Sequence, residues 1–232
     1  MPRDVRILTS RRSYEFSADA IRLTALSLPE NVQRVALALG FGSFGIGTPM
    51  LTFAEPLHTL PPGLVFDFGA VHVGDEVFPI RFLHIEARRV VIDVAAETWV
   101  IDHVYQRLRD ELSGVRAADG GPGLGEHQNT LEYSEIVARY RFSPTGWINP
   151  QLAEAVNQPG SDGLILVPTV YLAPQAVGDE SAGSVVQANS RMFQFSLRTG
   201  TRAAEHIYFS GAPLTSDAHR AFLERFETAF AC

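Results

Sequence analysis

Apolar and polar residues alternate along several stretches of the chain, and this period of two predicts half-buried β-strands. One stretch, residues 29–41, fits two interpretations. Val35 to Phe41 alternate as in a strand, whereas Pro29 suits the first turn of a helix. The other stretches are rich in branched and aromatic residues, which favour strands. The predicted strands are residues 19–28, 64–73, the two arms of 79–95, 131–142, 164–172, 193–197 and 206–209.

The segment 79–95 predicts a β-hairpin whose two-residue turn is Arg88-Arg89. With this turn, His84 and Asp93 lie opposite each other on the less apolar face of the hairpin. An imidazole held by a carboxylate is the central element of a general base. The register of the hairpin therefore decides whether these two side chains form a pair.

Two later stretches carry apolar residues every three or four positions, which predicts amphipathic helices. The first predicted helix covers about residues 98–113, with Thr98 as its cap. The second covers about residues 215–230, with Thr215 or Ser216 as its cap. A shorter helix is predicted for residues 149–157. Together these elements predict an α+β fold, mainly of antiparallel sheet, with the two long amphipathic helices packed on one side.

The length of 232 residues suits a single α+β domain, residues 1–232. The glycine-rich loop 117–128 is where we expect any subdivision, into residues 1–116 and 129–232. A hairpin followed by a helix occurs at 79–112 and again at 191–230. This repeat indicates either two similar halves or the coincidence of a common α+β motif.

Composition excludes several function classes. All 19 basic residues are arginine and the chain contains no lysine, as expected of a GC-rich bacterial-type gene. Without lysine there can be no Walker loop, no kinase strand lysine and no Schiff base. The net charge of −7 argues against nucleic acid as a partner.

The sequence also indicates where the protein works. We expect no membrane span, because no apolar run reaches about 20 residues. The first residues contain no apolar core of a secretory signal, and Cys232 is the single cysteine. We therefore expect a cytoplasmic protein whose fold needs no disulfide.

Candidate catalytic residues are few and dispersed. The catalytic candidates are His84, Asp93, Ser210 and His219. No G-x-S-x-G elbow and no zinc-binding spacing of histidine and cysteine accompanies them, so we expect neither a metal nor a cofactor. Residues 40–45 match the G-x-G-x-x-G string, but prolines rather than a helix follow, which argues against dinucleotide binding.

Several apolar and aromatic residues suit a partner surface instead. The interaction candidates are Phe41, Phe44 and Met50 in a loop rich in glycine and proline, together with Trp99 and Trp147. The sequence thus favours a non-catalytic protein-interaction or assembly module, and the partners we expect are a second copy or another protein. The alternative is a metal-independent, hydrolase-like enzyme that uses a His/Asp or Ser/His pair.

Overall fold

The computed structural model describes residues 2–47, 63–141, 169–172 and 192–230, and the predicted helix 149–157 lies outside them. Within these residues the chain is α+β, with nine strands and four α-helices. The strands are β1 (Arg3–Phe16), β2 (Ser43–Gly47), β3 (Gly63–Val73), β4 (Glu76–Glu86), β5 (Arg89–Val94), β6 (His127–Arg139), β7 (Val170–Leu172), β8 (Phe193–Leu197) and β9 (Ile207–Ala212). The helices are α1 (Leu23–Leu26), α2 (Pro29–Ala38), α3 (Thr98–Leu112) and α5 (Ser216–Phe230), and Ala203–Glu205 form a 3-10 turn.

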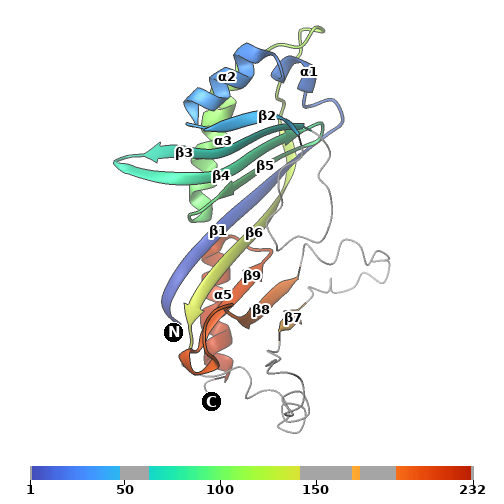
Figure 1. Ribbon diagram of the computed structural model, residues 1–232. Coiled ribbons are helices and arrows are strands. Elements are labelled where there is room, and N and C mark those ends of the chain that lie inside the picture. Colours follow the sequence, from blue (N-terminus) through green and yellow to red (C-terminus); the bar gives the residue numbers. More distant parts are fainter. Residues whose placement is uncertain (1, 48–62, 142–168, 173–191, 231–232) are drawn as a thin grey trace, which may run out of the picture. The chain divides into compact units, whose positions relative to one another are not determined.

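The strands form an antiparallel sheet in the order β2-β3-β4-β5-β1-β6-β9-β8-β7 (Figure 1). The chain divides into two compact units. The larger unit contains Leu8–Ser134 and Leu214–Ser216, and the smaller unit contains Met1–Ile7, Glu135–Pro213 and Asp217–Cys232. The long strands β1 and β6 each contribute residues to both units, and the loop 117–128 lies inside the larger one.

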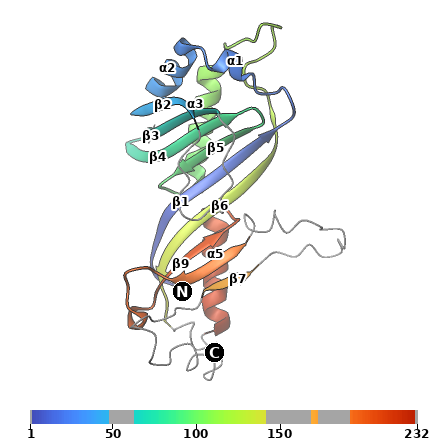
Figure 2. The same cartoon turned by 45° about the vertical axis from the view of Figure 1, so that its right-hand side comes forward.

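The larger unit buries one face of its sheet beneath α2 and α3 (Figures 1 and 2). The apolar stripe of α3 supplies Val104 and Leu108, and the sheet supplies Leu83 and Ile92, all of them without exposed surface. Such close packing on one face is the main source of stability of an α+β layer. The cap of α3 differs from the prediction, because the amide of Thr98 donates to the hydroxyl of Ser216 (3.0 Å).

The structure corrects the predicted strand at residues 19–28. Ile21 makes only an isolated bridge with Leu124, and the following residues form the short helix α1. The side chain of Asn31 donates to the carbonyl oxygen of Ala25 (2.8 Å), which ties α1 to α2. The ambiguous segment after Pro29 is a helix, because proline at N1 fits helical geometry and Val35 faces the core.

The register of the β4–β5 hairpin also differs from the prediction. Its two-residue turn is Ala87-Arg88, so that Glu86 pairs with Arg89 and His84 pairs with Val91. Asp93 instead lies opposite Phe82. The apolar alternation is the same for either turn, which is why it could not select the register.

The smaller unit pairs β9 with β8 and β8 with β7, and its core is aromatic. Phe195 stacks on Tyr208 with ring centroids 5.0 Å apart, and Phe193 meets Phe222 of α5 edge-on at 4.7 Å. The predicted helix near 215–230 corresponds to α5, which brings Phe222 and Phe226 onto these strands. No helix of the described residues is both long and apolar enough to cross a membrane.

Candidate functional site

The face of the larger unit's sheet opposite α3 carries a buried charged cluster around Asp93. Thr9 Oγ1 donates to one carboxylate oxygen (2.6 Å), and Arg11 donates to the other through Nε (2.9 Å) and Nη2 (2.8 Å). Arg81 approaches the first oxygen at 3.7 Å. Asp93 has no exposed surface, and Arg11 exposes 5%. Thr9 and Arg11 thus occupy both carboxylate oxygens of Asp93.

His84 shares this sheet face but lies two register pairs away from Asp93, beside Val91 and Val65. Its ring is fully buried, and neither nitrogen has a hydrogen-bond partner among the described residues. Burial, assisted by the positive charge of Arg89, lowers the pKa of His84 to about 4. His84 is therefore neutral near pH 7, and no carboxylate in the described ranges orients it as a general base.

The second catalytic pair of the sequence analysis lies in the smaller unit, and both residues are buried. Ser210 Oγ donates to the carbonyl oxygen of Ile136 (3.3 Å), which occupies the hydroxyl proton. His219 has no exposed surface, and its ring meets Phe193 edge-on. These contacts favour structural roles for Ser210 and His219 over an accessible nucleophile and base.

A network on the α3 side of the sheet was not predicted from the sequence. Arg12 of β1 forms ion pairs with Asp102 of α3 and with Glu132 of β6 (2.6 Å), and it also donates to the hydroxyl of Tyr14 (3.1 Å). Tyr14 stacks on Tyr105 with ring centroids 3.7 Å apart. Burial raises the pKa of each of these tyrosines to about 12, so both stay protonated. The network joins β1, α3 and β6 and holds the helix on the sheet.

The sequence alone indicates only the local parts of this network. Arg12 and Tyr14 are two apart in a strand, and Asp102 and Tyr105 are three apart in a helix, so each pair shares one face. The two pairs are separated by about 90 residues of sequence. Only the tertiary fold brings them together.

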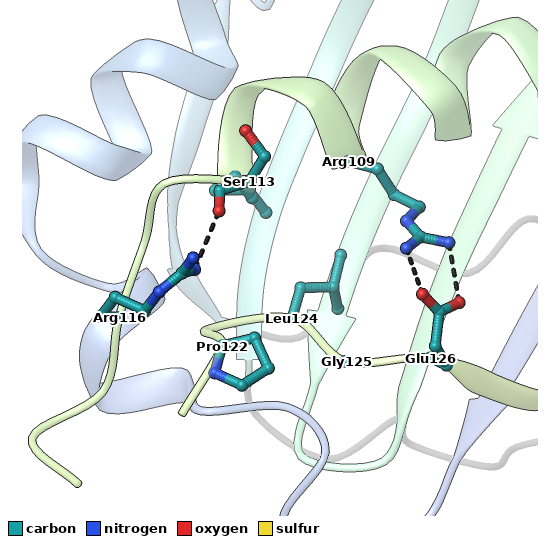
Figure 3. A pocket seen from close by; sticks show the side chains of 8 residues that line it. Arg109, Ser113, Arg116, Pro122, Leu124, Gly125 and Glu126 are labelled. Atoms are coloured by element: carbon teal, nitrogen blue, oxygen red, sulfur yellow. Dashed lines mark hydrogen bonds and ion pairs between the residues drawn. The ribbon is translucent and has the colours of Figure 1, made fainter. Parts of the chain in front are cut away.

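A surface pocket of about 360 Å³ lies at the C-terminal end of α3 (Figure 3). It is lined by Arg109, Leu112, Ser113, Arg116, Pro122, Leu124, Gly125 and Glu126. Arg109 donates to both carboxylate oxygens of Glu126, and Arg116 donates to the carbonyl oxygens of Ser113 (2.9 Å) and Val115 (3.2 Å). Both guanidinium groups thus have structural partners, and Arg116 caps the end of the helix.

The interaction candidates occupy different environments. Phe41 is 7% exposed and packs against Phe66 in the core, which corrects its expected place on a partner surface. Its ring lies directly over Gly69, where no larger residue fits, since a Cβ there would be 2.6 Å from the ring. Trp99 is 38% exposed, and its indole nitrogen donates to Glu97 (2.8 Å). Met50 and Trp147 lie outside the described residues.

Phe44 lies on β2, the outermost described strand at one edge of the sheet (Figure 1). Phe44 pairs with Phe66 and Ile46 pairs with Leu64, so these side chains share the face that carries the core. Phe66 and Leu64 are buried, yet Phe44 is 50% exposed and Ile46 is 80% exposed. Helix α2 runs beside this edge but leaves both side chains accessible (Figure 2). We call β2 with Phe44, Ile46 and the nearby Phe68 the β2 edge.

Two comparisons with known proteins bear on these sites. The chain matches no known protein-family model and no curated protein. Among the described residues, no group of three or more histidine, cysteine, aspartate or glutamate side chains could hold a metal ion.

Proposed function

We propose that this chain is a non-catalytic assembly module that works in the cytoplasm and associates through its β2 edge. The single observation that carries the proposal is the exposure of Phe44 and Ile46 on a strand with a hydrogen-bonded neighbour on one side only, among the described residues. Proteins normally protect such edges with charged residues or proline. The sequence Ser-Phe-Gly-Ile-Gly of β2 contains neither.

The buried polar residues give less support to an enzyme. Asp93 is fully engaged by Thr9 and Arg11, and His84 lies opposite a valine. The hydroxyl of Ser210 is bonded to a backbone carbonyl. Catalysis by a nucleophile requires an accessible group next to an oriented base, and the described contacts of these four candidates favour no such arrangement.

The partner that we propose is a second copy of this chain. In β2, Phe44 and Ile46 flank Gly45, so antiparallel pairing of two β2 strands about Gly45 sets Phe44 of each copy against Ile46 of the other. No charged side chain of β2 would oppose this pairing or select a foreign partner.

The area available predicts a reversible dimer. An aromatic side chain buries roughly 150–250 Å², and Phe44, Ile46 and Phe68 expose 50%, 80% and 79% of their surfaces. The three side chains therefore offer on the order of 400 Å² per copy. This is about half of the surface that each partner buries in a stable interface, which is typical of weak or transient association.

The test is sedimentation analysis over a range of concentrations. We expect the unmodified protein to form dimers and Ile46→Lys to remain monomeric, because the substitution sets a charged side chain against Phe44 of the other copy and so opposes pairing of the edges. Val77→Lys is the matched control, since Val77 is 55% exposed on β4 and away from β2. A monomeric wild-type protein at all concentrations, or equal effects of the two substitutions, would contradict the proposal.

We also propose that the two hairpin-helix segments are similar halves. In the larger unit β3, β4 and β5 precede α3, and β5 lies next to the long strand β1. In the smaller unit β7, β8 and β9 precede α5, and β9 lies next to the long strand β6. This shared order supports a duplication. Weak sequence similarity between the halves in relatives of this chain would test it.

A further inference from the structure

Phe68 has an unusual backbone conformation for a bulky residue. Its φ angle is +58°, in the left-handed region that favours glycine. For a residue with a Cβ, this conformation is less favourable than the right-handed one. The side chain is nevertheless 79% exposed, so no burial in the described fold compensates for that cost.

The surroundings of Phe68 fix this conformation from both sides. The amide of Gly42 donates to the carbonyl oxygen of Phe68 (3.3 Å), and the amide of Ala70 donates to the carbonyl oxygen of Leu39 (2.9 Å). Between them, the ring of Phe41 lies on Gly69 and leaves no room for a Cβ there. The backbone of this part of β3 is therefore held by the segment that connects α2 to β2, whatever side chain residue 68 carries.

Glycine at residue 68 would serve the isolated fold better than phenylalanine, because glycine adopts positive φ without strain. Because the described residues leave the phenyl ring exposed, its contribution lies outside the described fold. Asp67, the preceding residue, pairs with Ser43 at the start of β2, and Phe66 pairs with Phe44. The strained, exposed ring thus lies at the same end of the β2–β3 pair as Phe44.

We infer that Phe68 is an anchor residue of the dimer proposed above, and that it packs against a second copy of this chain. This role rests on the proposed function, and it assigns to Phe68 much of the binding free energy of the dimer. Phe68 is the most exposed of the aromatic side chains at the β2 edge, and aromatic anchors dominate the energetics of small interfaces. An apolar surface on the order of 400 Å² per copy needs such an anchor to associate measurably.

The experiment compares Phe68→Gly, Phe68→Leu and the control Val77→Ala in the full-length protein. Sedimentation gives the dimer dissociation constant, and thermal unfolding of the dilute monomer gives the midpoint. For Phe68→Gly we expect the dissociation constant to rise about tenfold, while the unfolding midpoint stays at or above that of the wild type. Phe68→Leu should keep most of the association, and Val77→Ala should change neither quantity.

The outcomes separate this inference from the proposed function. If Ile46→Lys abolishes the dimer but Phe68→Gly leaves its dissociation constant unchanged, the dimer forms through β2 and the role of Phe68 as an anchor is overturned. If the wild type is monomeric throughout, both proposals fail. If Phe68→Gly unfolds well below the wild type, the ring stabilises the monomer itself and the argument from strain is wrong. An association with a foreign protein in place of self-association would also overturn the commitment to a second copy.

Discussion

Asp93 lies in the larger unit without exposed surface, and Arg11 and Thr9 bond both of its carboxylate oxygens. Removing one member of a buried ion pair leaves the other charged and desolvated, which costs about 3–5 kcal/mol. We therefore predict that Asp93→Ala lowers the free energy of unfolding by about this amount, measured by urea denaturation. The simultaneous change Arg11→Met should restore part of the loss, and a smaller effect of Asp93→Ala than of the double variant would contradict the prediction.

His84 predicts a pH dependence of stability. Burial and the charge of Arg89 lower its pKa from 6.5 to about 4 in the folded protein. Between these two pH values the unfolded chain takes up a proton at His84 and the folded chain does not. The contribution of the neutral His84 to the free energy of unfolding should therefore be fully present above pH 6.5. It should be lost as the pH is lowered towards 4.

The size of this loss can be isolated by substitution. A pKa difference of this size corresponds to roughly 3 kcal/mol at most. The variant His84→Leu lacks the titrating group, so its stability should decline less steeply in urea denaturation across the same pH range. Equal slopes for the two proteins would show that His84 titrates normally in the fold.

At the scale of elements, α3 is fastened to the sheet by Arg12. The guanidinium joins Asp102, whose side chain is 61% exposed, to Glu132, which is 19% exposed. We predict that Arg12→Leu lowers the free energy of unfolding by about 1–3 kcal/mol, because it leaves Glu132 half-buried and unpaired. The double variant Arg12→Leu/Glu132→Leu should recover part of this loss.

The exposed partner provides the matched control for this network. Asp102→Ala removes one ion pair of Arg12 but leaves no buried charge, so we expect a change below about 1 kcal/mol. Chemical denaturation of the wild type, Arg12→Leu, Asp102→Ala and the double variant gives the order of their free energies of unfolding. A loss from Asp102→Ala as large as that from Arg12→Leu would mean that the exposed pair carries the attachment of α3.

Periodic apolar patterns were sufficient to predict an α+β fold with a mainly antiparallel sheet, because each pattern is long and is decided by local burial. They failed where a competing contact decided the structure. The side chain of Asn31 donates a hydrogen bond to the carbonyl oxygen of Ala25 in α1. In the β4–β5 hairpin, a turn that lies one residue earlier than predicted separates His84 from Asp93. The buried Phe41 and the exposed Phe44 look alike in sequence, since their difference depends on Gly69 and on the edge position of β2. The network around Arg12 depends on contacts across about 90 residues, which no local pattern contains.

At the scale of the whole molecule, charge opposes self-association. Each copy carries a net charge of −7, whereas β2 has no charged residue. Two like-charged copies repel through solvent, and salt screens this repulsion. We predict that raising the ionic strength from about 0.02 M to about 0.5 M tightens the dimer in sedimentation experiments. Weaker association at high salt would instead indicate an interface held by ion pairs.

The two compact units are not continuous pieces of chain, because β1 and β6 each contribute residues to both and Leu214–Ser216 belongs to the larger one. A fragment ending at Ser134 would lose the hydroxyl of Ser216 that accepts from the amide of Thr98, and the carbonyl of Leu214 that accepts from Ser134. Neither half can therefore be excised by cutting the gene at one place. Dissection of this protein must proceed by substitution within the intact polypeptide, because the chain passes from one unit to the other four times.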